Sequence, residues 1–138
     1  MKKILIVTGD PNSINSEIIY KTWKKINTKI KKRIYIISNY RLLKSQFKKL
    51  NYSIKMLDVK NIINHSDATS LKIINIDLNF KDPFNVPLKF ASKFVTKSLD
   101  RAHDLAQEKN VAGIINCPIN KNLLGQKGIG VTEYLSKK

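Results

Sequence analysis

The stretch Val111–Leu135, VAGIINCPINKNLLGQKGIGVTEYL, decides the class of fold. Its apolar start, 111–116, predicts a buried strand, which ends in a polar turn at 116–121. A short helix and a second turn at Gly130 then lead into the last residues of the stretch. In open α/β sheets, ligands bind beyond the carboxyl ends of strands, where polar loops lead into helices. The stretch therefore predicts an α/β fold with a ligand site at this turn.

The residues before this stretch alternate between strand and helix patterns. Apolar runs predict strands at 3–7, 33–38, 52–57 and 71–76. Helically spaced apolar residues predict helices at 14–27, at 40–50 and from Pro87, as the first helical residue, to about Lys109. This alternation predicts three layers, with a mostly parallel sheet and flanking helices. Because no repeat or linker divides the chain, we expect residues 1–138 to form a single α/β region.

The formal net charge of +16 permits two interpretations. One is a nucleic-acid-binding surface, because clustered cations neutralise phosphates. The other is compositional bias, since 23 Lys and only 3 Arg are spread over a chain that also has 20 Ile and 14 Asn. Arginine makes the bidentate contacts to phosphate and guanine, and it is nearly absent. Nucleic acid is therefore the less favoured partner.

Four cations on the predicted long helix stand four residues apart: Lys89, Lys93, Lys97 and Arg101. Like charges at this spacing destabilise a helix by about 0.2–0.5 kcal/mol per pair. They form either a solvated face, the favoured interpretation, or an electropositive rim for a phosphorylated ligand.

The compartment and the metal content follow from short patterns. The apolar run at 4–7 is too short for a signal peptide, and no run approaches the roughly 18 residues of a membrane span. A single cysteine, Cys117, excludes an internal disulfide, so we expect a cytoplasmic protein without a membrane partner, and we expect Cys117 to be a small buried side chain. His65 and His103 lack metal-ligand spacing, which predicts no metal held by this chain.

The turn at 8–13 contains Asp10, Asn12 and Ser13, any of which is suited to capping the next helix. The start of a helix at such a turn also suits an anion. However, the chain has neither a G-x-G-x-x-G nor a Walker A pattern, which favours a plain turn with a capping Asp10.

The stretch 111–135 offers three further candidates. Asn120 either caps the next helix or contacts a ligand, and Lys121 is either solvated or holds a phosphate or oxyanion as a point charge. Thr132 suits the N-cap of the last helix, a role that is compatible with ligand binding.

Several segments together resemble the 4-hydroxythreonine-4-phosphate dehydrogenases of vitamin B6 biosynthesis. Residues 9–17, GDPNSINSE, match the family pattern GDPAGIGPE at five of nine positions. Residues 99–102 match its LDRA, and 117–121, CPINK, are similar to its APINK. Residues 130–134, GVTEY, resemble its GHTEF, with Val131 at the histidine position.

The resemblance implies part of the isocitrate/isopropylmalate dehydrogenase-like fold and an NAD- or NADP-dependent oxidation of a phosphorylated hydroxy-amino acid, followed by decarboxylation. It also implies homodimers of two-domain subunits and a divalent metal (Zn, Mg or Co) held by histidines that lie beyond this chain. Residues 1–138 would be the N-terminal part of such a subunit, inactive alone, or else a non-catalytic remnant. The substrate-binding residues carried over are Thr132, Val131 at the histidine position, Lys121 and Asn120, with Asp10 and Glu133 as further candidates.

Overall fold

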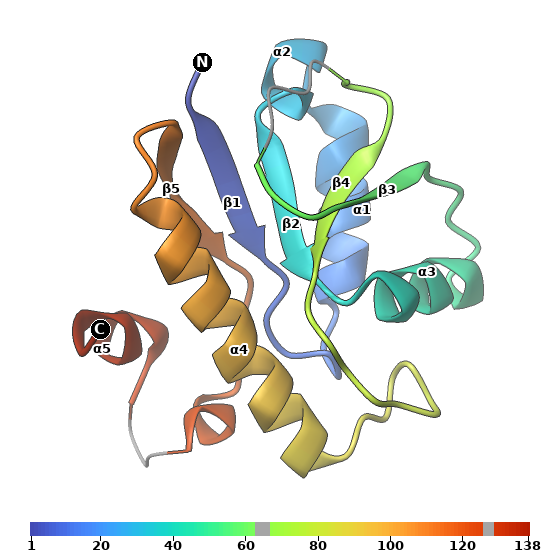
Figure 1. Ribbon diagram of the computed structural model, residues 1–138. Helices are drawn as coiled ribbons and strands as arrows, with labels where there is room; N and C mark the ends of the chain where they lie inside the picture. Colours follow the sequence, from blue (N-terminus) through green and yellow to red (C-terminus); the bar gives the residue numbers. More distant parts are fainter. Residues whose placement is uncertain (63–66, 126–128) are drawn as a thin grey trace.

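The computed structural model describes residues 1–62, 67–125 and 129–138. Within these ranges the chain forms five strands, and helices separate most of the successive strands (Figure 1). In order, the elements are β1 (Lys3–Val7), α1 (Asn15–Lys25), α2 (Thr28–Lys31), β2 (Ile34–Ser38), α3 (Tyr40–Lys49), β3 (Met56–Val59), β4 (Leu71–Asn75), α4 (Leu88–Ala106), β5 (Val111–Asn116), the 3₁₀ helix η1 (Lys121–Leu124) and α5 (Val131–Ser136). Among the helices of these three ranges, none is both long enough and apolar enough to cross a bilayer.

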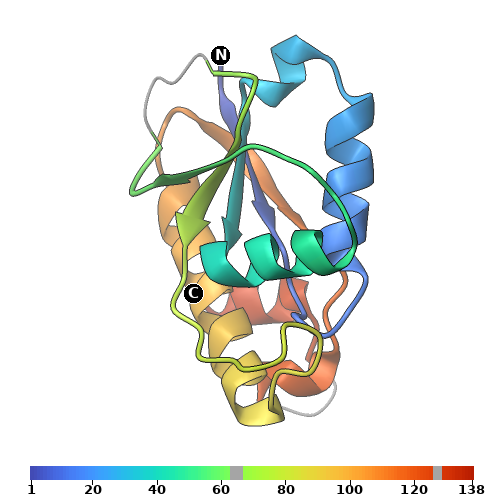
Figure 2. The same cartoon turned by 90° about the vertical axis from the view of Figure 1, so that its right-hand side faces the viewer.

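The strands form one sheet in the order β3-β4-β2-β1-β5, and every pairing is parallel. All five residues of β2 are buried, as expected of a central strand with both faces covered. Figure 2 shows α1 on one side of the strands and α4 on the other. The predicted three-layer α/β class is therefore confirmed.

Each face of the sheet has its own apolar cluster. On one face, Ile19 and Trp23 of α1 pack with Leu43 and Phe47 of α3. On the other face, the buried stripe of α4, including Phe94 and Leu99, packs against β1 and β2. The helically spaced apolar residues of the predicted long helix are buried from Ala91 to Leu105, whereas Leu88 is 65% exposed.

The third strand lies later in the chain than predicted. The expected range was 52–57, but β3 begins at Met56, which pairs with Leu71 of β4. Tyr52 instead stacks on Tyr20 of α1, with ring centroids 4.0 Å apart and planes at 1°. A contact with another helix, rather than the local alternation, determines the conformation of this segment.

The helix ends also differ from prediction. The first helix stops at Lys25, so Ile30 lies on the separate α2 and is 36% exposed. Pro87 is the N-cap of α4 and not its first helical residue, because its ψ of 140° is extended. The helix ends at Ala106 rather than near Lys109, and the next N–H groups bond carbonyls three residues back.

Candidate functional site

The connections that follow β1 and β5 diverge to opposite faces of the sheet. These two strands are neighbours, but β1 leads to α1 on one face, whereas β5 leads to η1, which packs on α4 on the other. Ser92 of α4 donates a hydrogen bond of 2.6 Å to the carbonyl of Leu123 in η1. In α/β sheets, ligands bind at the carboxyl edge where neighbouring connections diverge in this way.

Gly9 lets the two connections touch. Its φ of 71° lies in the left-handed region, and a Cβ there would lie 2.8 Å from the Pro118 carbonyl oxygen and 2.9 Å from that of Cys117. Only glycine accepts both conditions. As a result, the N–H of Asp10 lies 3.4 Å from the Pro118 carbonyl oxygen.

Asn15 joins the same two connections with its side chain. Its amide Nδ2 donates to the Thr8 carbonyl at 2.7 Å and to the Pro118 carbonyl at 2.8 Å. The residue is 2% exposed, and its Oδ1, like Ser16 Oγ, is buried with no hydrogen-bond partner within the described ranges. The family pattern has a glycine at this position, which could make none of these side-chain bonds. The asparagine in place of this glycine is the sequence feature that could have drawn attention to position 15. The hydrogen bonds of Asn15 were not predicted.

Asp10 shapes its own turn and does not cap α1. Its Oδ1 accepts a hydrogen bond of 2.9 Å from the N–H of Asn12. The Asn12 side chain then pairs with both backbone groups of Val86, at 2.7 and 2.8 Å. The N-cap of α1 is Ile14, which has no capping side chain, so the prediction that Asp10 caps this helix is wrong. Ser13, another predicted candidate, does contact the helix start, because its Oγ accepts a hydrogen bond of 3.3 Å from the N–H of Asn15, the first helical residue.

Asn120 and Lys121 stand at the start of η1. Asn120 Oδ1 accepts a hydrogen bond from the N–H of Asn122 at 3.1 Å, so its predicted capping role is confirmed. Lys121 is exposed, and its amine has no hydrogen-bond or ion-pair partner among the residues that the structure describes. Its Cε lies 3.9 Å from the position that a Cβ on Gly130 would occupy, which places Lys121 beside the start of α5.

Gly130, and not Thr132, is the N-cap of α5. Glu133 explains the difference, because its Oε2 accepts a hydrogen bond of 3.1 Å from the Gly130 N–H and so starts the helix two residues earlier. Thr132 is exposed on the first turn. Val131, at the histidine position of the family pattern, packs its half-buried side chain against the apolar cluster beneath α4.

Tyr134 connects α5 to α4. Its hydroxyl donates a hydrogen bond of 2.7 Å to Asp100 Oδ1, and Lys138 forms an ion pair with the same carboxylate. Partial burial and then the Asp100 carboxylate raise the pKa of Tyr134. Partial burial opposes ionisation of Asp100, but the hydrogen bonds from Lys138 and Tyr134 hold its pKa below its ordinary value. The segments that resemble LDRA and GHTEF are thus in direct contact.

Cys117 is a buried thiol. It is 8% exposed, and burial raises its pKa to about 11. At neutral pH the side chain is therefore a protonated apolar group and not a thiolate nucleophile. The prediction of a small buried side chain is confirmed.

The described residues do not fit a divalent metal. Within the ranges 1–62, 67–125 and 129–138, no group of three or more His, Cys, Asp or Glu side chains converges. His103 lies on α4 with its Nδ1 3.9 Å from Asp104 Oδ1, and His65 lies outside the described residues. No chemical step is therefore assigned to a metal held by these residues.

Comparisons with known proteins agree with the sequence patterns. A family model described as "Pyridoxal phosphate biosynthetic protein PdxA" matches residues 29–138. The chain is 34% identical to the 4-hydroxythreonine-4-phosphate dehydrogenase of Aquifex aeolicus and 30% identical to that of a Sulfurihydrogenibium species. Each alignment covers 99% of this chain and 42% of the relative, so the chain spans less than half the length of these relatives.

Solved structures of dehydrogenases with the same name share the fold. The enzyme from Burkholderia phymatum superposes with a TM-score of 0.83 at 21% identity, and the Klebsiella pneumoniae enzyme with 0.82 at 24%. Both superpositions cover 99% of this chain and 43% of the solved chain. As predicted, the chain therefore has part of the isocitrate/isopropylmalate dehydrogenase-like fold. With a family model matching most of its length, the chain belongs to the PdxA family of pyridoxal phosphate biosynthetic proteins.

Proposed function

We propose that this chain is the N-terminal part of a two-domain 4-hydroxythreonine-4-phosphate dehydrogenase. The enzyme would oxidise and then decarboxylate a phosphorylated hydroxy-amino acid as a cytoplasmic homodimer. The observation that carries the proposal is the convergence of the family segments at one edge of the sheet. The turn that contains Gly9 contacts the polar turn at 116–121 through Pro118, and Lys121 of that polar turn lies beside Gly130.

Lys121 and Asn120 would bind the substrate on this edge. The Lys121 amine is exposed and has no partner in the described part of the chain, so it can act as a point charge toward the substrate phosphate or a developing oxyanion. The side-chain oxygen Oδ1 of Asn120 accepts the bond that caps η1, so the side-chain NH₂ group of Asn120 is left to donate to a ligand.

The first turn of α5 would provide the rest of the substrate contacts. The Thr132 hydroxyl is exposed there, whereas Glu133 is engaged with the Gly130 N–H. Val131 offers no hydrogen bond where the family pattern has histidine, so one substrate contact is missing.

The cofactor and the metal would act from outside the residues described here. NAD or NADP would accept the hydride, and a divalent metal would polarise the substrate oxygen. Because the described residues provide no three-ligand metal set, its histidines would come from the remainder of the subunit and from its partner.

Substitution of Lys121 tests the proposal in the complete gene product. We expect Lys121→Ala to lower kcat/KM by about 10- to 100-fold, the equivalent of one charge-assisted hydrogen bond of about 1.5–3 kcal/mol. The measurement is NAD(P)H formation from 4-hydroxythreonine 4-phosphate. Lys109→Ala removes the same charge from an exposed position between α4 and β5 and should leave kcat/KM unchanged. Equal rates for the two variants would remove Lys121 from the site.

The second candidate is a non-catalytic member of the family, favoured by the packing of Val131 against the core. Val131→His distinguishes the two. An increase in kcat/KM supports an enzyme that lacks one contact. An inactive parent and an inactive variant, both folded by circular dichroism and with no reading frame for the second domain, support the non-catalytic member.

A further inference from the structure

A cavity of about 640 Å³ opens at the carboxyl ends of β2, β3 and β4, and no residue of the polar turn at 116–121 lines it. Neighbouring strands β2 and β4 lead to opposite faces of the sheet, β2 into α3 and β4 through a connection into α4. The divergence makes this a second crevice of the kind in which α/β sheets bind ligands. Its volume is typical of small-molecule sites, which span about 300–1,000 Å³.

Five charged side chains from four parts of the fold line this cavity. Arg41 begins α3, Lys93 and Lys97 lie on α4, Asp58 is on β3 and Asp77 follows β4. Within the described ranges, none of these side chains forms an ion pair or a hydrogen bond, although both signs of charge are present. Their bonding capacity is therefore available to a ligand.

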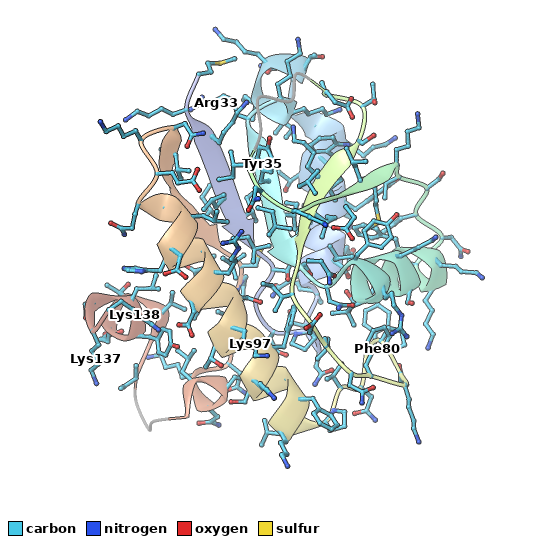
Figure 3. All side chains as sticks on the ribbon, viewed as in Figure 1. Arg33, Tyr35, Phe80, Lys97, Lys137 and Lys138 are labelled. Carbon is cyan, nitrogen blue, oxygen red and sulfur yellow. The ribbon has the colours of Figure 1, made fainter. Side chains whose placement is uncertain are left out.

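An aromatic ring that is not itself part of the cavity lining orients one of the cations. The Arg41 guanidinium lies over the Phe80 ring, 5.3 Å from its centroid. Figure 3 shows Phe80 on the connection that follows β4 and Lys97 on α4. Stacking of this kind holds the planar guanidinium, which reduces the rotamer freedom that binding would remove.

Two uncharged side chains of the cavity, Asn39 and Asn75, have partners in the fold. Asn39 Oδ1 accepts from the N–H of Leu42 at 2.9 Å, and its Nδ2 donates to the Ile76 carbonyl at 2.8 Å. Asn75 Oδ1 accepts from the N–H of Tyr40 at 2.8 Å. These bonds hold the start of α3 to the ends of β2 and β4, which is where Arg41 and Asp77 enter the cavity.

The structure also separates the four cations that stand four residues apart on α4. Lys93 and Lys97 line the cavity, whereas Lys89 does not. Arg101 is used elsewhere, since its Nη2 donates to the Lys60 carbonyl at 3.3 Å and to Asn61 Oδ1 at 2.9 Å. Two of the four cations, Lys93 and Lys97, are therefore placed where an electropositive rim of the cavity would need them.

We propose that this cavity binds a small phosphorylated molecule that carries hydroxyl groups. The phosphate would contact Arg41, Lys93 and Lys97, since guanidinium and ammonium groups donate to phosphate oxygens. The carboxylates of Asp58 and Asp77 would accept from the hydroxyl groups. The site shares no residue with the segments that resemble the family patterns, so it is additional to the proposed substrate site.

Binding of two probes to the isotope-labelled 138-residue chain tests the site. Inorganic phosphate and glycerol 3-phosphate are titrated at near-physiological salt, which screens loose binding to exposed lysines. We expect saturable shifts of the amide signals of 39–41 and 75–79. Lys93→Ala/Lys97→Ala should weaken binding of both probes by at least about tenfold, because two charged hydrogen bonds to the phosphate are lost.

A matched variant, Lys25→Ala/Lys29→Ala, removes two exposed charges from α1 and α2, outside the cavity. It should leave both affinities within about twofold, a free-energy change of about 0.4 kcal/mol. Equal weakening by the two double variants would overturn the proposal, because the lysines would then act only through the net charge. All four lysines are exposed, and the amide spectrum of each variant shows directly that it is folded.

Asp77→Asn distinguishes a specific binding site from a surface that is merely positively charged. The distinction rests on whether the variant raises or lowers the affinity for each probe. Loss of the negative charge should tighten binding of inorganic phosphate, because a repulsion is removed. The same variant should weaken glycerol 3-phosphate, because a carboxylate that accepts from its hydroxyl group is lost. Tighter binding of both probes would overturn the hydroxyl part of the proposal. Neither result depends on dehydrogenase activity, so the outcome is independent of the proposed function.

Discussion

The candidate site at the carboxyl ends of β1 and β5 depends most on Asn15. Its amide spans the gap between the connection after β1 and the connection after β5, and it contacts a carbonyl 103 positions away. Gly9 makes the approach possible, and Asn15 holds it. Gly9 and the first residue of α1 therefore position the polar turn that carries Asn120 and Lys121.

Replacing Asn15 should destabilise the fold. Asn15→Ala removes two donated hydrogen bonds and, in partial compensation, the buried oxygen that has no partner in the described chain. We expect a net loss of about 1–2 kcal/mol in the free energy of unfolding, measured by urea denaturation.

Asn122→Ala is the matched control for this prediction. Its side chain is exposed and forms no hydrogen bond within the described ranges, so the change should remain within about 0.5 kcal/mol. If Asn15→Ala is as stable as the control, the Asn15 bonds do not hold the two connections together.

At the scale of elements, α5 depends on a small number of contacts. Val131, Tyr134 and Leu135 pack against the cluster beneath α4, and Asp100 receives the Tyr134 hydroxyl and the Lys138 amine. A helix of six residues is not stable in water by itself, so these contacts keep it folded. The position of Thr132 therefore depends on the contact between α5 and α4.

Tyr134→Phe should loosen α5 without disturbing the sheet. The lost hydrogen bond goes to a partly exposed carboxylate, so we expect a local cost of about 0.5–1 kcal/mol. Hydrogen exchange followed by mass spectrometry should show faster exchange over residues 131–136 and unchanged exchange in β1 and β2. Faster exchange throughout the chain would contradict a local role.

Tyr52→Phe controls for the loss of a tyrosine hydroxyl. That ring stacks on Tyr20, and its hydroxyl makes no hydrogen bond to any described residue. Exchange over α5 should therefore match that of the parent chain.

For the molecule as a whole, a buried lysine makes stability depend on pH. Lys72 of β4 is 0% exposed, and its amine donates to the carbonyls of Lys32 at 3.2 Å and Asp67 at 3.1 Å. It also lies 4.9 Å from the centroid of the Tyr35 ring. Burial, and then the nearby Lys3, lower its pKa below the ordinary 10.5.

The sign of the pH effect follows from that lowered pKa. Between the lowered value and 10.5, the unfolded chain holds a proton on Lys72 that the folded chain has released. Stability from this group therefore rises with pH through that window and is lost as pH falls through the folded pKa. Relative to Lys72→Met, the parent chain should gain free energy of unfolding as pH approaches 10.5.

Urea denaturation at several alkaline pH values measures this difference. Lys44→Met, at an exposed position of α3, should show no such trend relative to the parent chain. A difference between the parent and Lys72→Met that stays constant with pH would mean that the Lys72 amine has the same pKa in both states.

Elements with a strong local pattern could be predicted from the sequence. The apolar runs of β1, β2 and β5 are recognisable alone, and so are the heptad-like stripe of α4 and the N-cap of η1 at Asn120. Predictions failed where a distant partner outweighed the local preference. Tyr52, for example, stacks on Tyr20 and leaves the strand. The N-cap of α5 failed for a local reason instead, because Glu133 bonds the Gly130 N–H within the same turn and moves the cap from Thr132 to Gly130.

The sequence by itself determined the α/β class and the family, because both follow from short patterns of apolar residues and from ordered motifs such as CPINK. The tertiary structure alone decided the strand order, the Asn15 bridge and the cavity of Arg41, Lys93 and Lys97. The reason is physical. A strand or a cap forms from interactions within a few residues, whereas a binding site forms from side chains that only packing of the whole chain brings together.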